Sequence, residues 1–310
     1  MSTDAHLSSY LSMSSATQTL LTVRDWLRYT VTQMHLHDVH TGQGTASLWD
    51  DAVFLVLRTL HLPIDQLEPF LDARLLPHEC EQLQLNIDQR CLERIPTAYL
   101  VHEAWLSGYR FRVDPQVLIP RSPISELLSM QLLPWLDDPE GVQRIADICT
   151  GSGCLAILAA LHFPHATIDA TDLSETALEI ARANVADYRL DDRLSIYQGN
   201  LLDALPDEAC YDLIICNPPY VNAESMSQLP AEYEHEPSLA LAGGPDGMDL
   251  VRELIANARL YLTVDGILLL EIGHEAEHFE AAFPELDPLW LDTAATERNI
   301  LLLRAAQLPS

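Results

Sequence analysis

A glycine-rich loop carries the first residues whose types and spacing could do chemistry. The segment Asp147–Ala156 follows an apolar run and matches the pattern Gly-x-Gly-x-x-Ala. Gly151 and Gly153 allow the backbone to turn sharply and approach a ligand, while Ala156 lets the next helix pack close to the strand. Asp172 lies nineteen residues after Gly153, where a carboxylate can accept both hydroxyls of a ribose. The set predicts a site for a cofactor that contains a nucleoside, in preference to a bare structural turn.

Asp147, at the mouth of this loop, bears on which cofactor would bind. Nicotinamide dinucleotides and S-adenosylmethionine both use such a strand, loop and helix. A carboxylate here would repel a pyrophosphate, but it can hold the cationic end of S-adenosylmethionine. Asp147 could equally serve as a turn or cap acceptor within the loop, and both roles are open.

The tetrapeptide Asn217-Pro-Pro-Tyr220 follows the apolar run Leu213–Cys216, so it should lie at the carboxyl edge of a sheet, where ligands bind. An amide nitrogen is a weak nucleophile because its lone pair is delocalised. The side-chain oxygen of Asn217 and the backbone carbonyl of Pro218 could accept its two N–H bonds and orient it toward a methyl sulfonium. Pro219 would fix the backbone, and Tyr220 would pack on the planar group. The alternative is an ordinary strand-ending turn.

Neither a metal ion nor a general base is expected at this site. The histidines include His35, His37 and His40, but no carboxylate or cysteine completes a coordination set with them, which favours surface loop histidines. An amide nitrogen that has received a methyl group is acidic enough to lose its proton to water, so the reaction does not require a basic side chain.

Short apolar runs that alternate with helical stretches should position these residues. From Arg144 onward the alternation predicts an α/β fold with a parallel sheet covered by helices. The last two runs, Leu289–Leu291 and Ile300–Leu303, are separated by only a short polar stretch, so we expect them to pair antiparallel at an edge. The expected parallel strands are Arg144–Ile148, Thr167–Thr171, Leu194–Gln198, Leu213–Cys216 and Gly266–Ile272.

The first part of the chain has a different period. Apolar residues from Leu20 to Arg94 recur at helical spacing, which predicts a helical domain, and Ser47 with Asp50 is typical of a helix start. One expected helix would bury an apolar stripe that ends at Pro63 and consists of Trp49, Ala52, Val53, Val56 and Leu60. After Pro96 the period changes to two around Ser107-Gly108, which predicts a β-hairpin, and a helix should then run through Leu127, Leu128, Leu132 and Trp135.

The overall composition excludes several classes of partner. The chain has 310 residues, 17 basic and 46 acidic, and a net charge of −29, so direct binding of nucleic acid is not expected. Such a field would attract a basic protein, but on charge alone the favoured interpretation is that it only keeps the protein soluble. Residues 1–15 contain no export signal and no long apolar run follows, which favours a cytoplasmic protein without a membrane span. The six cysteines form no close pairs and are expected to be reduced core residues.

These motifs together resemble the class I S-adenosylmethionine-dependent methyltransferases that modify amino or amide nitrogens. The resemblance to the protein-glutamine methyltransferases covers nearly the whole chain. It implies a Rossmann-like, mostly parallel seven-stranded sheet with an antiparallel edge hairpin, preceded by a small helical domain. The segments that carry it are Arg94–Leu100, Trp105 with Tyr109–Val113, Val117–Arg121, Glu236-Pro237, Ala240–Leu250 and Glu271–Gly273.

Two branches of that family differ after the Ile-Pro of the entry segment. The branch that acts on release factors usually has Arg-Pro-Glu-Thr-Glu there, whereas this chain has Arg121-Ser-Pro-Ile-Ser-Glu126. The latter is similar to the branch that methylates a glutamine of large-subunit ribosomal protein L-three, as are Trp26–Arg28, Gly42–Thr45 and Trp49-Asp50. The resemblance therefore implies S-adenosylmethionine as cofactor, a basic ribosomal protein as substrate and a role in ribosome assembly.

The resemblance also implies roles for individual residues. Asn217, Pro218, Pro219 and Tyr220 would hold the glutamine amide, with Asn217 also near the cofactor. Arg121 would be either a substrate clamp or a salt-bridge partner. The cofactor-binding set is Asp147, then Thr150, Gly151, Ser152 and Gly153 for the methionine end, Asp172 for the ribose, and Asn200 and Leu201 near the adenine. The family usually has an acidic residue at the place of Asn200 and often an aromatic one at Leu201, so other side chains could pack the adenine here.

The expected domains are a helical substrate-recognition domain over residues 1–94, a β-hairpin linker over 95–122 and a catalytic domain over 123–310. Two other functions compete with glutamine methylation. An adenine amino methyltransferase can share Asn-Pro-Pro-Tyr, but the acidic charge argues against it. A silent cofactor-binding module would not need an intact Asn217. Oligomeric state is open.

Overall fold

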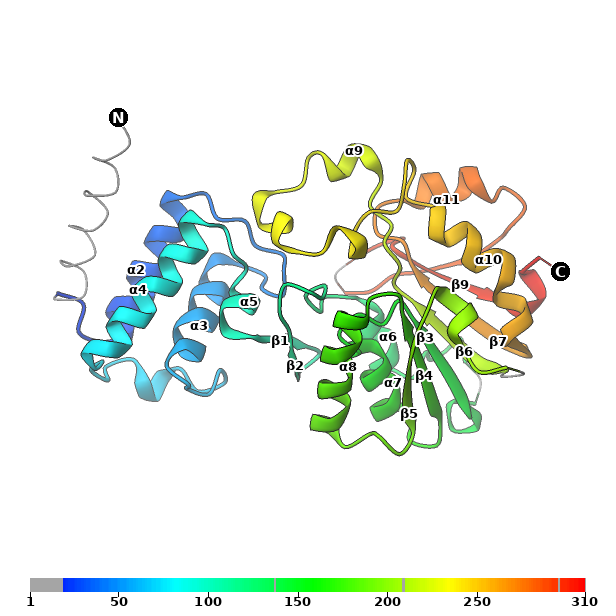
Figure 1. The fold of residues 1–310 in the computed structure, drawn as a ribbon, viewed down its shortest axis with the longest axis horizontal. Coiled ribbons are helices and arrows are strands. Elements are labelled where there is room, and N and C mark those ends of the chain that lie inside the picture. The colour runs from blue at the N-terminus through cyan, green and yellow to red at the C-terminus, as the bar shows by residue number, and fades with distance from the viewer. Residues whose placement is uncertain (1–18, 137, 208–209, 295, 310) are drawn as a thin grey trace. The chain divides into compact units, whose positions relative to one another are not determined.

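The computed structural model describes residues 19–309 except residues 137, 208–209 and 295. Over this part the chain forms two compact units (Figure 1). The first, the helical unit, contains the residues up to His102 together with a return segment, Pro230–His235. The second, the sheet unit, contains Glu103–Leu229 and the residues from Glu236 onward. The expectation about an export signal concerns residues 1–15, which lie outside the described part.

Helices with side-chain caps build the helical unit. The hydroxyl of Thr22 accepts from the backbone N–H of Asp25, and that of Ser47 accepts from the N–H of Asp50, so Ser47 starts a helix as predicted. The helices are α2 (Val23–Leu36), α3 (Leu48–Thr59), α4 (Pro77–Leu92) and α5 (Thr97–Val101), with 3-10 turns η1 (Glu68–Phe70) and η4 (Ala231–His235). Their core contains Trp26, Leu27, Leu55, Val56, Leu83, Ile87 and Cys91.

Trp49 does not belong to the buried stripe that the sequence predicts, because 51% of it is exposed. Leu48 is the residue that packs against the core at this end of α3. Leu48, Ala52 and Val56 are spaced four residues apart and therefore lie on one face of the helix. Trp49 is the next residue after Leu48, so its side chain points away from that face.

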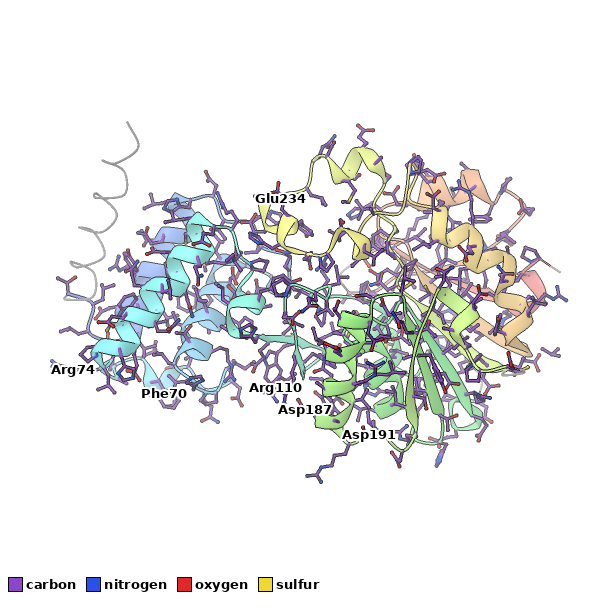
Figure 2. All side chains as sticks on the ribbon, viewed as in Figure 1. Phe70, Arg74, Arg110, Asp187, Asp191 and Glu234 are labelled. Carbon is purple, nitrogen blue, oxygen red and sulfur yellow. The ribbon has the colours of Figure 1, made fainter. Side chains whose placement is uncertain are left out.

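A two-stranded hairpin opens the sheet unit. Strand β1 (Glu103–Leu106) pairs antiparallel with β2 (Tyr109–Arg112), as predicted, and the turn residues Ser107 and Gly108 both have positive φ, at 50° and 82°. Arg110 of β2 lies beside Asp187 of helix α8 (Glu175–Tyr188) (Figure 2), with 3.9 Å between the charged groups.

A seven-stranded sheet forms the centre of this unit, in the order β5-β4-β3-β6-β7-β9-β8. The predicted parallel strands are confirmed, and β8 and β9 pair antiparallel at an edge as expected. Strand β9 also pairs antiparallel with β7. The strands are β3 (Arg144–Ile148), β4 (Thr167–Asp172), β5 (Leu194–Gln198), β6 (Tyr211–Cys216), β7 (Leu262–Glu271), β8 (Leu289–Leu291) and β9 (Ile300–Arg304).

Helices pack on both faces of the sheet, because successive strand residues point to opposite sides. Leu213 and Ile215 lie in the core with α6 (Ile124–Ser129), α7 (Cys154–His162) and α8 (Glu175–Tyr188). Ile214 and Cys216 lie in the core with α10 (Asp249–Tyr261) and α11 (Ala276–Ala282). The remaining elements are α9 (Ala223–Met226) and the 3-10 turns η2 (Pro139–Gly141), η3 (Leu201–Ala204), η5 (Ser238–Ala240) and η6 (Ala305–Gln307).

The helix that the sequence predicts through Trp135 is shorter, since α6 ends at Ser129. Pro134 has no N–H to donate, and its ring would clash with the carbonyl of residue 130 in a continued helix. The chain leaves the helix through Gln131 and Leu132, which both have positive φ, while Leu132 stays buried.

The cysteines are free, but they are not all core residues as expected. Cys210 is exposed and Cys149 is half-buried; those that are buried are Cys80, Cys91, Cys154 and Cys216. No helix in the described part of the chain is long and apolar enough to span a membrane.

Candidate functional site

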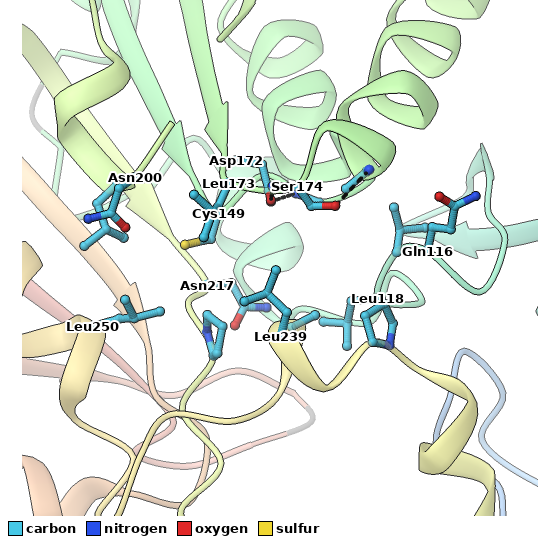
Figure 3. A pocket seen from close by; sticks show the side chains of 17 residues that line it. Gln116, Leu118, Cys149, Asp172, Leu173, Ser174, Asn200, Asn217, Leu239 and Leu250 are labelled. Atoms are coloured by element: carbon cyan, nitrogen blue, oxygen red, sulfur yellow. Dashed lines mark hydrogen bonds between the residues drawn. The ribbon is translucent and has the colours of Figure 1, made fainter. Parts of the chain in front are cut away.

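A pocket with a cavity volume of about 140 Å³ opens at the carboxyl ends of β3, β4 and β6. Figure 3 shows Asp172, Asn200 and Asn217 around this one cavity. The residues predicted for the site that line the pocket are Gly151, Asp172, Asn200, Leu201, Asn217 and Pro219.

The two loop glycines serve different purposes. Gly151 has φ of 55° and lines the pocket, and a side chain added there would meet no atom within 4 Å. Gly153 has φ of 78° and begins α7, where an added Cβ would lie 3.2 Å from the Cβ of Ala181 in α8. Gly151 therefore leaves the cavity open, whereas Gly153 allows α7 and α8 to pack closely.

The structure shows Asp147 in one of the two roles that the sequence left open, that of a turn and cap acceptor. Its carboxylate is 1% exposed, and Oδ2 accepts from the hydroxyl of Thr150 at 2.5 Å and from the N–H of Ala156 at 3.0 Å. Oδ1 has no hydrogen-bond partner among the described residues. Burial raises the pKa of the Asp147 carboxyl to about 7. One oxygen thus holds the loop, and the residue itself does not line the pocket.

Asp172 closes β4 and presents its carboxylate to the pocket. One oxygen accepts from the N–H of Gly151 and the other from the N–H of Ser174, both at 2.9 Å (Figure 3 shows the bond to Ser174). Burial raises the pKa of this carboxyl above its ordinary value. Each carboxylate oxygen has a further lone pair, so the Asp172 carboxylate can still accept hydrogen bonds from the two hydroxyls of a ribose.

Asn200 and Leu201 line the pocket next to Leu250 of α10. The Asn200 amide donates to the carboxylate of Glu253 in α10 at 2.5 Å. Leu201 is buried, has φ of 43°, and its carbonyl accepts from the hydroxyl of Thr171 at 2.9 Å. A planar base placed here would contact aliphatic side chains, because no aromatic residue lines this pocket within the described chain.

The tetrapeptide from Asn217 continues directly from β6. Asn217 and Pro219 line the pocket, whereas Pro218 is buried and Tyr220 is half-buried beside it. The backbone stays extended beyond the tetrapeptide, because Val221 donates its N–H to the carbonyl of Leu241 at 2.8 Å. Asn217 is therefore fixed at a strand end and is not on a free loop.

Several predicted residues lie behind the cavity wall. Thr150 and Ser152 are buried within the loop, and the Ser152 hydroxyl oxygen has no partner in the described part of the structure. Arg121 forms the salt bridge that the sequence left as one alternative: its guanidinium donates to both oxygens of Glu236, at 2.6 and 3.0 Å.

Sequence reasoning missed the opposite wall of the pocket. This wall is formed by Gln116, Val117 and Leu118 and by Pro237, Leu239 and Ala240. Leu239 is 54% exposed. Both stretches lie within or beside the segments that resemble the methyltransferase family, and that was the only signal that could have found them. In the described residues no group of three His, Cys, Asp or Glu side chains could hold a metal ion.

Comparison with known proteins identifies the family. Residues 127–232 match the family model described as a methyltransferase small domain. A ribosomal protein uL3 glutamine methyltransferase of Bordetella pertussis is 60% identical, covering 94% of this chain and 97% of that protein. Proteins with the same name from Burkholderia pseudomallei (51%; 96% and 99%) and Neisseria gonorrhoeae (47%; 95% and 98%) are also similar. The chain therefore belongs to the ribosomal protein uL3 glutamine methyltransferase family.

Proposed function

We propose that this protein transfers the methyl group of S-adenosylmethionine to the side-chain amide nitrogen of a glutamine in uL3, the large-subunit ribosomal protein L-three. The observation that carries the proposal is the position of Asn217, which opens at the end of β6 onto the same pocket as Asp172. Family membership supports the choice of uL3 as substrate. The proposal extends to ribosome assembly, in which uL3 takes part.

The residues at the pocket suit S-adenosylmethionine. Asp172 would accept the ribose hydroxyls, and the unpartnered oxygen of Asp147 would accept from the ammonium group, with Thr150–Gly153 around the methionine end. Asn200 and Leu201 would border the adenine. The cofactor supplies an electrophilic methyl group on a sulfonium, and its positive charge complements the carboxylate of Asp172 in the pocket wall.

The tetrapeptide would hold the glutamine amide. The Asn217 side-chain oxygen and the Pro218 carbonyl would each accept one amide N–H, and both bonds strengthen as positive charge develops on the attacking nitrogen. Pro219 adds no competing N–H, and the Tyr220 ring would cover the planar amide and exclude water. The methylated nitrogen then gives its proton to water.

The net charge of −29 fits a basic protein substrate. We assign substrate recognition to the helical part, residues 1–94, with residues 95–122 as a hairpin linker and 123–310 as the catalytic domain. Since the proposed substrate is a ribosomal protein, we place the reaction in the cytoplasm and expect no direct contact with nucleic acid.

The test is transfer of labelled methyl from S-adenosylmethionine to purified uL3, to a release factor and to adenine-containing nucleic acid, in parallel reactions. We expect label on uL3 and background on the others. Preferred labelling of the release factor would assign the chain to the sister activity, and label on nucleic acid would support an adenine methyltransferase. Cofactor binding without transfer to any of them would indicate a silent binding module.

A further inference from the structure

Tyr220 lies in a close-fitting environment of three glycines. A Cβ at Gly273 would overlap the Tyr220 ring, and Cβ atoms at Gly243 and Gly247 would overlap its backbone. Contacts this close leave no room for another side chain at these positions. The ring and the main chain of Tyr220 are therefore restrained from separate segments, the loop after β7 and the loop before α10.

The Tyr220 hydroxyl forms a hydrogen bond with a buried carboxylate. It donates to Oε1 of Glu271 at 3.1 Å, and Glu271 is only 5% exposed at the end of β7. The other oxygen, Oε2, accepts from the hydroxyl of Ser122. A buried carboxylate is stable only when its oxygens have partners, and here each oxygen accepts from a hydroxyl.

Through Ser122, the Glu271 carboxylate is also hydrogen-bonded to the segment that contains Arg121. Ser122 also accepts from the N–H of Ile124 at 3.2 Å, at the start of α6, and Arg121 pairs with the fully buried side chain of Glu236. Burial raises the pKa of Glu271 to about 6, so the group is ionised at pH 7.5 and its bond to the Tyr220 hydroxyl is charge-assisted.

We propose that Glu271 is a positioning residue for methyl transfer, which holds the Tyr220 ring through its hydroxyl and thereby fixes the approach of the glutamine amide to Asn217. The proposal rests on the role given to Asn217–Tyr220 above. Glu271 does not line the cofactor pocket, so its effect is on the substrate side of the reaction and not on cofactor binding.

A double-mutant cycle on the full chain tests this link. Glu271→Ala and Tyr220→Phe should each lower kcat for uL3 by about tenfold, since each removes the same hydrogen bond. The double variant should also lose about tenfold, because the two changes act through one contact. The dissociation constant for S-adenosylmethionine, measured by calorimetry, should stay within about twofold of wild type in all three.

Two further variants separate positioning from general stability. Glu271→Gln keeps a neutral acceptor for the Tyr220 hydroxyl but loses the charge of the carboxylate, so it should lower kcat by only about threefold. Tyr211→Phe is the matched control, because the Tyr211 hydroxyl also donates to a buried carboxylate, Asp169, at 2.8 Å. This control should lower the melting temperature and leave kcat unchanged.

Each other outcome overturns the inference. Additive losses, about a hundredfold in the double variant, would mean that Glu271 and Tyr220 act independently. A parallel loss of cofactor affinity would assign Glu271 to the cofactor site, and a lower melting temperature with unchanged kcat would leave it only a structural role. If Glu271→Ala does not fold, Glu271→Gln must still lower kcat in the wild-type background and have no effect in the Tyr220→Phe background.

The failure of the proposed function gives a different result. A wild-type enzyme that leaves uL3 unmodified would contradict the proposed function and this inference together, whereas the outcomes above contradict only the inference.

Discussion

At the scale of single residues, the protonation of Asp147 bears on the cofactor binding proposed above. Its folded-state pKa of about 7 lies above its ordinary value of 3.8, because the buried carboxylate prefers its neutral form. The free protein therefore binds a proton here that the unfolded chain does not. Between about pH 4 and 7, this group lowers stability as pH rises. A cationic ligand group reverses the preference, because it requires the ionised carboxylate.

We predict that the affinity for S-adenosylmethionine rises by up to about tenfold per pH unit between pH 5 and 7 and is constant above pH 7. The reason is that only ionised Asp147 attracts the ammonium group. Calorimetry across this range measures it. Asp147→Asn should bind more weakly and with a flatter pH dependence. The same slope in that variant would place the titrating group elsewhere.

A second prediction at this scale concerns Asn217. Replacement by Ala removes one of two acceptors for the developing charge, so kcat should fall by about 10²–10³, by analogy with the loss of one oxyanion-hole donor. Cofactor affinity should change much less, as measured by calorimetry. Asn257→Ala, on the exposed face of α10, is a suitable control with unchanged kcat. Equal loss of turnover and affinity in Asn217→Ala would show that Asn217 mainly holds the cofactor.

At the scale of elements, the loop between β3 and α7 depends on two glycines with positive φ. Gly151→Ala and Gly153→Ala should both be destabilised by about 1–2 kcal/mol because of that backbone conformation. Gly153→Ala should lose more, since its Cβ would press on Ala181. Urea denaturation compares them directly, with Ala160→Gly in α7 as a helix-propensity control. Greater loss in Gly151→Ala would contradict the assignment of close packing to Gly153.

The sequence predicts regular elements better than it predicts the pocket wall. Strands β3 and β5 have the predicted bounds because their apolar runs are short and bounded by polar residues. The helix expected through Trp135 failed because Pro134 overrides an apolar pattern that stays buried without being helical. Pro237–Ala240 forms a pocket wall around the 3-10 turn η5, which is too short to leave a periodic pattern in the sequence.

At the scale of the whole molecule, the helical unit includes a segment from far along the chain. Glu232, in the return segment, is buried and accepts from Arg90 at 3.5 Å, from Arg94 at 3.3 Å and from the N–H of His40 at 2.8 Å. A contact between residues 142 positions apart leaves no local pattern, so the sequence did not reveal it. The return segment thus adds a buried carboxylate to the helical unit.

Glu232→Ala should therefore lower the free energy of unfolding by about 3 kcal/mol, because it leaves the buried guanidinium of Arg90 with one carboxylate partner fewer. Denaturation followed by tryptophan fluorescence detects this, since Trp26 lies in the core of that unit. Asp72→Ala, which removes an exposed partner of Arg24, should have little effect. Equal midpoints for the two variants would contradict the anchoring role of Glu232.

The charge of the whole chain predicts a salt effect on substrate capture. With 46 acidic and 17 basic residues, kcat/KM for uL3 should fall on the order of tenfold as salt rises from low to high concentration, since screening slows the encounter. The dissociation constant for the cofactor should change little. A glutamine peptide without Lys or Arg provides the control. An equal salt effect on that peptide would argue against long-range attraction.

The central claim is glutamine methylation of uL3 in preference to other proteins, and mass-spectrometric mapping tests it most directly. The full-length protein is incubated with S-adenosylmethionine and an equimolar mixture of uL3 and a release factor, and the methylated residue is located by fragmentation. The account predicts one methyl group on the side-chain amide nitrogen of a single glutamine of uL3. Methylation of the Gly-Gly-Gln loop of the release factor with uL3 unmodified would contradict it.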